Sequence, residues 1–341
     1  MSALPASRTA PAPHHLLIPF AVCNSDHWLP AMKALPEGST RQLHQLLQGM
    51  KEVHNDVQDA QTLSPPHERA LARALGLAHA ETPDGLIPWA AKDAAERLRA
   101  DSSRGWAWIT PCHWAMGREH AILTDPAALA LREEESRALL AAMQPYFETD
   151  GITLHYAQEL GPERWLAEGE LFRTLPSASL DRVLGSNVDP WLPSEKDDVK
   201  GGAAGKMRLL QNEMQMLLYT HPLNEVRVAR RQLPVNSFWL SGTGALATAA
   251  AQAPDGEISM PRSLAQAVFN DDWAAYAQAW AALDAGDIAA LLARQRAGER
   301  VQLTLCGERG ARTFDSSQAS LWARISNLLA PKPLWNELGK L

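Results

Sequence analysis

The sequence is poor in cysteine and has no long apolar run. Its three cysteines, Cys23, Cys112 and Cys306, lie far apart and form no CxxC pair. This excludes a disulfide framework, and we expect three thiols packed as small apolar groups. No apolar run approaches the roughly 20 residues needed to cross a bilayer. Residues 1–14 also lack the apolar segment of a signal peptide. We therefore expect a cytoplasmic protein with no membrane partner.

Positive charge is also scarce. The formal net charge is -7, which argues against a protein that wraps nucleic acid through bulk charge, although a local basic patch stays open. Hydrophobic residues make up 46% and charged residues 21%, so a core can be buried without disulfides. Nucleic acid is therefore not an expected partner.

Tryptophan, in contrast, is abundant, with 12 residues against 4 tyrosines. Trp106, Trp108 and Trp114, with Arg104 and Arg118 nearby, could stack nucleic acid bases. The neighbours of these tryptophans are apolar, however, and such a strand is more often part of a core. We favour the core.

Short apolar runs alternate with helical patterns along the chain. Strands are expected at residues 15–21, 106–110, 237–240 and 301–305, and the main helices at residues 133–147, 206–219 and 264–296. This alternation predicts an α/β fold with a mostly parallel, helix-covered sheet. We expect residues 1–14 to form a flexible tail and residues 15–341 a single α/β domain. A charged, glycine-containing stretch near residues 194–205 is the candidate mobile loop.

The most informative stretch runs from residue 219 to residue 244. A helix rich in arginine precedes a strand that ends in Ser241-Gly242-Thr243-Gly244. Glycines let a backbone approach a ligand closely, free N–H groups at a helix start attract anions, and arginine can grip a phosphate. The alternative is a tight strand-to-helix turn beside solvated arginines. The candidate anion-binding residues are Arg227, Arg231, Asn236, Ser241, Gly242 and Gly244.

This stretch resembles a segment of the archaeal-type cofactor-independent phosphoglycerate mutases, which belong to the alkaline phosphatase superfamily. The matching residues are His221, Pro222, Asn224, Arg227, Arg230, Pro234, Asn236, Trp239, Leu240, Gly242 and Gly244. The resemblance implies an alkaline-phosphatase-like core, whole or truncated.

Over its whole length the chain is similar to a bacterial group described as phosphoglycerate mutase-like or as RpfE-type regulatory proteins. The runs that carry this similarity are residues 63–72, 110–114 and 179–183. The similarity implies a regulatory role without naming an activity.

Two metal ions, held by clustered aspartate and histidine, are needed by the resembling enzymes. In those enzymes a metal-binding aspartate follows the first strand, and further ligands follow the Trp-Leu-x-Gly-x-Gly run. Here Val22-Cys23-Asn24-Ser25 follows the first strand, and no histidine occurs after His221. We therefore expect no metal, no cofactor and no phosphoglycerate mutase activity of that type.

Other residues could contact a ligand without forming a complete catalytic site. Ser241 is not in a GxSxG elbow, and no aspartate and histidine order supports a triad. His113 and His120 are seven residues apart, which is no standard zinc spacing. The possible ligand contacts are His67, Arg69, His113, His221 and Asn224.

Three functions fit this sequence. We favour a non-catalytic relative of the phosphoglycerate mutases that binds a phosphorylated small molecule or a protein partner, with a regulatory role. The first alternative is a metal-dependent mutase or phosphatase with a rearranged site. The second alternative is a nucleic-acid-associated protein. The sequence does not define the oligomeric state.

Overall fold

The computed structural model describes residues 13–194, 202–246 and 256–318. They divide between two compact units, where a single domain was expected. Unit 1 comprises Met1–Ala60, Pro66–Ala74 and Gln252–Leu341, and unit 2 comprises Gln61–Pro65 and Leu75–Ala251. Each unit has a hydrophobic core of its own, which explains the division. The predicted tail falls almost wholly outside the described residues, as does most of the predicted mobile loop.

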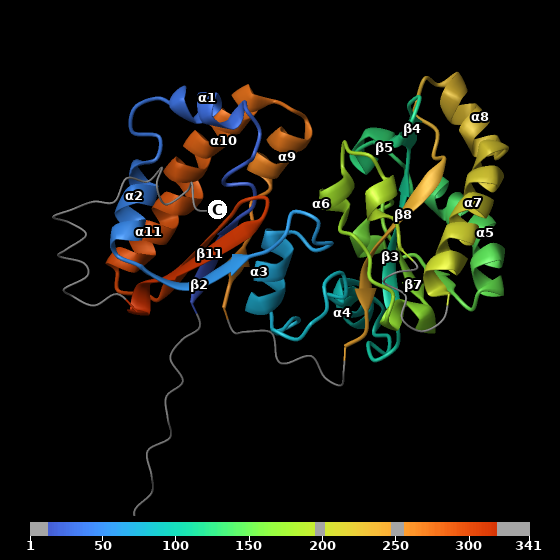
Figure 1. Ribbon diagram of the computed structural model, residues 1–341, viewed down its shortest axis with the longest axis horizontal. Helices are drawn as coiled ribbons and strands as arrows, with labels where there is room; N and C mark the ends of the chain where they lie inside the picture. The colour runs from blue at the N-terminus through green and yellow to red at the C-terminus, as the bar shows by residue number, and fades with distance from the viewer. Residues whose placement is uncertain (1–12, 195–201, 247–255, 319–341) are drawn as a thin grey trace, which may run out of the picture. The chain divides into compact units, whose positions relative to one another are not determined.

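Unit 1 contains a mixed five-stranded sheet in the order β2-β11-β10-β1-β9 (Figure 1). Strand β1 is parallel to both of its neighbours, β9 and β10. Strand β11 is antiparallel to β10 and β2. The strands are β1 (His14–Ile18), β2 (Lys51–Val57), β9 (Ile258–Ser259), β10 (Val301–Cys306) and β11 (Gly310–Asp315).

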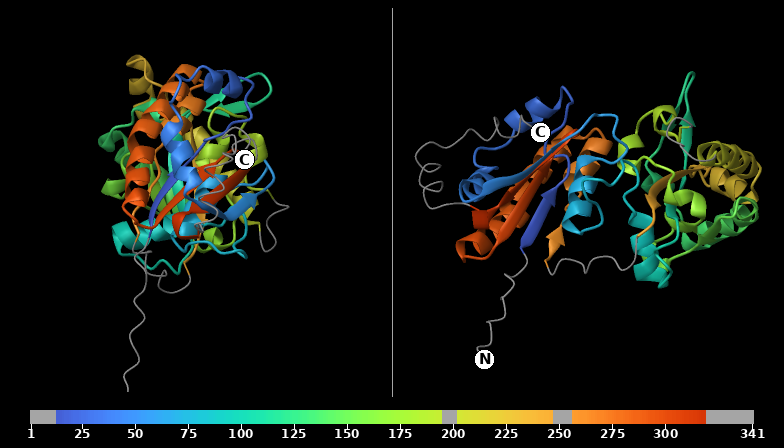
Figure 2. Two further views of the ribbon diagram at one scale, coloured as in Figure 1. Left: turned by 90° about the vertical axis from the view of Figure 1, so that its left-hand side faces the viewer. Right: turned by 60° about the horizontal axis from the view of Figure 1, so that its bottom comes forward.

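Successive side chains of a strand point to opposite faces of the sheet, and helices of unit 1 pack against both faces. Leu16 and Ile18 of β1 belong to the larger core, together with residues of five helices, whereas Leu17 packs with Ala70 of α3 (Pro66–Ala74). Figure 2 shows the orange helices α10 and α11 running along the sheet. The five helices are α1 (Trp28–Lys33), α2 (Arg41–Gln48), α9 (Ser263–Phe269), α10 (Trp273–Leu283) and α11 (Ala289–Arg296).

Unit 2 is built on a four-stranded sheet in the order β6-β7-β3-β8, in which every pair of strands is antiparallel. A separate hairpin joins β4 to β5. The strands are β3 (Trp106–Cys112), β4 (Trp114–Met116), β5 (Ala121–Leu123), β6 (Thr153–His155), β7 (Trp165–Glu168) and β8 (Ser237–Gly244). The longer helices are α5 (Glu133–Thr149), α7 (Ala203–Tyr219) and α8 (Pro222–Ala229); the shorter ones are α4 (Trp89–Asp93) and α6 (Leu180–Val183).

The α/β class expected from the sequence is confirmed, but the mostly parallel arrangement is wrong for unit 2. Parallel neighbours need a long crossover, usually a helix, whereas a short loop leaves two strands antiparallel. The nine residues between β6 and β7 contain no α-helix, only a 3₁₀ turn at Gln158–Leu160. In unit 1, the short turn at residues 307–310 likewise leaves β10 and β11 antiparallel.

The three cysteines and two of the three tryptophans named above are buried, as the apolar interpretation predicts. Trp106 and Trp114 are buried, at 1% and 8% exposure, as the core interpretation predicts, whereas Trp108 is partly exposed and has the Arg164 guanidinium 4.3 Å from its ring centroid. All three cysteines are buried and free. Within the described residues, no helix combines the length and the apolarity that a membrane crossing requires.

Candidate functional site

The carboxyl ends of the parallel strands of unit 1 lie at one edge of the sheet. Beyond β1 the chain continues through Phe20 to Asn24, beyond β9 it reaches Arg262, and beyond β10 it forms the turn that carries Glu308 and Arg309. Open α/β sheets bind their ligands at this edge. We call these residues, together with the first turn of α3, the carboxyl-edge site.

The segment after β1 is held in a fixed conformation. Phe20 has a φ of 53°, in the left-handed region that a bulky residue rarely adopts. The Tyr276 hydroxyl donates to the Phe20 carbonyl oxygen at 2.8 Å, and the Trp28 indole N–H donates to the Tyr276 oxygen at 3.1 Å. The Ala21 N–H donates to the Cys306 carbonyl at 2.7 Å. These bonds fix the direction in which the chain leaves β1.

Cys23 belongs to this segment but is poorly suited to act as a nucleophile. Burial and the negative charge of Glu308 raise the pKa of the Cys23 thiol to about 12. The thiolate is the reactive form, and it is scarce at neutral pH when the pKa is this high. Cys23 therefore acts as a packed thiol.

His67 connects α3 to the end of β9. It is 1% exposed, and its ring centroid lies 5.6 Å from that of Phe20. The Arg262 guanidinium lies 6.0 Å from the centroid of the Phe269 ring, and its Nη1 donates to His67 Nε2 at 3.4 Å. Since guanidinium can only donate, His67 Nε2 must be the acceptor. The site thus contains a cation held against two rings.

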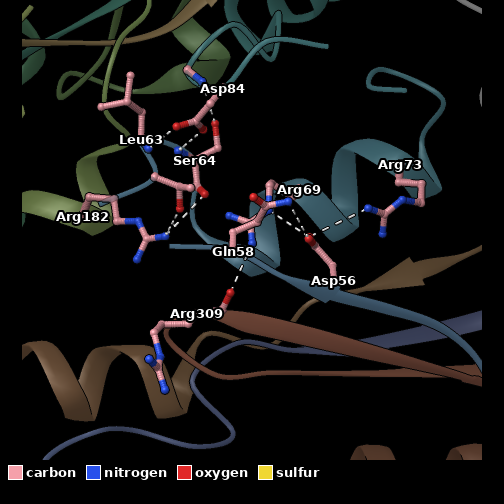
Figure 3. A network of polar contacts seen from close by, with 11 residues as sticks. Asp56, Gln58, Leu63, Ser64, Arg69, Arg73, Asp84, Arg182 and Arg309 are labelled. Atoms are coloured by element: carbon pink, nitrogen blue, oxygen red, sulfur yellow. Dashed lines mark hydrogen bonds and ion pairs between the residues drawn. The ribbon is translucent and has the colours of Figure 1, made fainter. Parts of the chain in front are cut away.

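Arg69 and Asp56 form the second polar group of the site (Figure 3). Arg69 Nε donates to Asp56 Oδ2 at 2.8 Å, and Arg73 lies 3.8 Å from the same oxygen. The Arg309 carbonyl oxygen accepts from the Gln58 N–H at 3.1 Å and from Arg69 at 3.4 Å. The Arg309 side chain is exposed and points away from Arg69 in Figure 3. Arg69 therefore anchors the turn that presents Arg309.

The predicted anion-binding residues lie in unit 2, and Arg227 does not suit that role. Its side chain is 0% exposed. Its guanidinium donates to Glu135 at 3.0 Å, to the Leu233 carbonyl at 2.8 Å and to the Leu129 carbonyl. Arg227 therefore holds α8 to α5 and to the neighbouring loops. Arg231 lies just after α8 with a φ of 59° and is exposed.

The Gly-x-Gly turn, expected after a strand at residues 237–240, lies within the longer strand β8. Gly242, with a φ of 63°, lies where the register of β3 against β8 shifts between Trp106 and Trp108. A Cβ on Gly242 would lie 2.7 Å from the Trp108 ring, and one on Gly244 would lie 3.0 Å from Pro88. The glycines therefore permit a β-bulge and close packing. From the sequence we also expect an alanine-rich helix after Gly244, and residues 247–255 of that segment lie outside the described residues.

Ser241 and Asn236 are also engaged within unit 2. Ser241 is 4% exposed in the middle of β8. Asn236 Oδ1 accepts from the Trp114 N–H at 2.7 Å, and its amide donates to the Trp114 carbonyl at 2.9 Å. Asn236 thus joins the start of β8 to the hairpin of β4 and β5.

The remaining predicted contacts of unit 2 act locally. His221 is the N-cap of α8, where Nδ1 accepts from the Leu223 N–H at 3.2 Å. Asn224 donates to the carbonyls of Leu218 and Val235 at 2.8 and 2.7 Å. His113 Nδ1 lies 2.9 Å from the Pro234 carbonyl. The structure thus places His67 and Arg69 in the carboxyl-edge site of unit 1, whereas His113, His221 and Asn224 belong to unit 2.

Four residues of the carboxyl-edge site were not predicted from the sequence: Asn24, Arg262, Glu308 and Arg309. The available signal was their position immediately after predicted or short strands, and the Gly-Glu-Arg-Gly run at residues 307–310 is a turn pattern. Taken within either unit alone, the described residues bring no three histidine, cysteine or carboxylate side chains together as a metal site would need.

Comparisons with known proteins give little further information. No protein-family model matches the chain, and no curated protein matches it. One similar solved structure is a cofactor-independent phosphoglycerate mutase from Thermoplasma acidophilum, with 12% identity, a TM-score of 0.36 and 89% of each chain covered. Another is the PH0037 protein from Pyrococcus horikoshii, with 12% identity, a TM-score of 0.41, and 90% of this chain and 88% of that chain covered. At these TM-scores, neither likeness carries an argument about this protein.

Proposed function

We propose that the protein binds a phosphorylated small molecule at the carboxyl-edge site of unit 1. The observation that carries this proposal is that Asn24, Arg262 and Arg309 lie in the segments that follow β1, β9 and β10, at the carboxyl edge of the sheet. This edge is the usual ligand position in open α/β sheets. Guanidinium groups and amide N–H groups are the donors that bind phosphate oxygens in proteins.

The two arginines differ in how firmly they are held. Arg262 is half-buried, with its guanidinium near the Phe269 ring and bonded to His67. Arg309 is exposed on a turn whose backbone is fixed by Arg69 and Gln58. A fixed arginine would orient the phosphate, and an exposed one would attract it.

Binding is favoured over turnover because the candidate nucleophiles are poorly placed. Cys23 has a raised pKa, and Ser241 is buried within a strand of unit 2. A regulatory role follows from binding a metabolite without consuming it. Trp106 and Trp114 are buried and cannot stack on bases, and the partly exposed Trp108 ring already has the Arg164 guanidinium 4.3 Å from its centroid, which favours a small ligand over nucleic acid.

The same proposal includes a distant, non-catalytic relation to the cofactor-independent phosphoglycerate mutases, with an alkaline-phosphatase-like core in unit 1. Its support is the residue pattern from His221 to Gly244 and the mixed sheet with helices on both faces. A protein partner in place of a metabolite is the alternative within this proposal.

Isothermal titration of the full chain with 3-phosphoglycerate tests the proposal. Arg309→Ala and Arg262→Ala should each weaken binding about tenfold, as expected for the loss of one charged hydrogen-bond donor group. Arg296→Ala is the matched control. Arg296 is the last residue of α11 and precedes β10, so it lies near the opposite edge of the sheet, where its side chain donates to Gln45. Absence of any binding heat, or equal losses in all three variants, would refute the proposal.

A further inference from the structure

Asn24 and Glu308 form a two-point contact within the carboxyl-edge site. The Asn24 backbone N–H donates to Glu308 Oε1 at 3.1 Å. Its side-chain Nδ2 donates to Glu308 Oε2 at 2.9 Å. Each oxygen of one carboxylate therefore accepts one hydrogen bond from the same residue. A pair of donors spaced in this way fits any group that presents two oxygens on one atom, such as a carboxylate or a phosphate.

The position of this contact links it to ligand binding. Asn24 lies in the segment that leaves β1, and Glu308 lies in the turn between β10 and β11. Because β1 and β10 are adjacent and parallel, the contact spans the ends of two neighbouring strands. Both side chains are at least partly exposed, so solvent reaches them. The donors of Asn24 therefore point at an anion in the place where a bound ligand is expected.

We propose that Asn24 is a further contact for the phosphorylated ligand, and that Glu308 occupies the Asn24 donors until the ligand displaces it. This inference rests on the proposed function. Glu308 acts as an internal competitor, because its carboxylate takes the hydrogen bonds that two phosphate oxygens would take. It also places a negative charge beside Arg309, the next residue in the chain. Only a ligand with a stronger anionic group, such as a phosphate of higher charge, gains enough to replace it.

The pKa of Cys23 shows that the negative charge of Glu308 acts on neighbouring groups. Burial is the main cause of the raised pKa of Cys23, and Glu308 adds to it. The negative charge of Glu308 therefore acts on Cys23, the residue before Asn24. The same charge opposes the approach of a phosphate, so removal of the carboxylate should tighten binding.

A titration series with 3-phosphoglycerate tests the inference. Glu308→Ala should lower the dissociation constant about three- to tenfold, the range expected when a surface charge interaction and its competing hydrogen bonds are removed. Asn24→Ala added to Glu308→Ala should remove part of this gain, because the side-chain amide donor is then absent while the backbone N–H remains. Glu299→Ala is the matched control, since Glu299 precedes β10 at the opposite edge, where it pairs with Arg294. That variant should bind like the wild type.

The outcomes separate this inference from the proposed function. If the wild type binds and Glu308→Ala binds equally or more weakly, the competitor role of Glu308 is refuted while the function stands. A gain that is undiminished in the double variant refutes the role of the Asn24 side chain. If neither the wild type nor Glu308→Ala binds 3-phosphoglycerate, both the inference and the proposed function fail. Equal thermal melting of the variants shows that the fold is retained.

Discussion

Arg227→Ala should destabilise unit 2 and leave ligand binding by the folded protein unchanged. Arg227 is fully buried and pairs with Glu135, which is itself 4% exposed. Removing one partner of a buried ion pair leaves an uncompensated charge and typically costs about 3 to 5 kcal/mol. Glu135 keeps its contact with Arg132 at 3.2 Å, so we expect the lower end, about 3 kcal/mol.

Urea unfolding of the full chain, followed by circular dichroism, measures this cost. With a slope of about 1 to 3 kcal/mol per molar urea, a loss of 3 kcal/mol lowers the midpoint by about 1 to 3 M. Arg230→Ala is the control, because Arg230 is exposed at the C-cap of the same helix. Its effect should stay within about 0.5 kcal/mol.

The reasoning would be refuted by the opposite pattern. A loss below about 1 kcal/mol for Arg227→Ala, together with weaker binding of 3-phosphoglycerate, would mean that this arginine serves the ligand. The anion-binding role predicted from the sequence would then stand.

Two further predictions concern packing and protonation. Gly242→Ala should lower the free energy of unfolding in urea by about 2 to 4 kcal/mol, because alanine is strained in the left-handed region and its Cβ would clash with the Trp108 ring. Gly286→Ala is the control, because a Cβ there has no atom within 4 Å, and it should cause no such loss. Equal losses in the two variants would contradict this prediction. His15 has its pKa lowered to about 4 by burial, so it stays neutral in the folded state while the unfolded chain binds a proton below about pH 6.5. Stability should therefore fall by about 3 kcal/mol between pH 6.5 and 4, and His15→Gln should remove that share of the slope; an unchanged slope in the variant would contradict the assignment.

Strongly apolar strands and long amphipathic helices were predictable from the sequence. The run from residue 15 to residue 21 contains most of β1, and the predicted helices at residues 133–147 and 206–219 became α5 and α7. Strand β2 was missed because its sequence, Lys-Glu-Val-His-Asn-Asp-Val, is polar. It lies at the edge of the sheet, where burial does not select apolar residues.

Strand direction and the site were less predictable, for physical reasons. Periodicity identifies a strand but not its partner, so the antiparallel sheet of unit 2 was not foreseen. Arginine and glycine near a turn suggested anion binding, but in the fold Arg227 pairs with Glu135 and Gly242 packs against Trp108. The carboxyl-edge site draws its residues from segments almost 300 positions apart, such as Asn24 and Glu308, and only tertiary structure brings them together.

The location of a bound phosphate mimic tests the central claim most directly. Crystals soaked in tungstate would reveal the anion through its anomalous scattering. The account predicts a peak at the carboxyl ends of β1, β9 and β10, beside Arg262 and Arg309. A peak beside Gly242 and Gly244 instead, or no peak in unit 1 at millimolar tungstate, would contradict it.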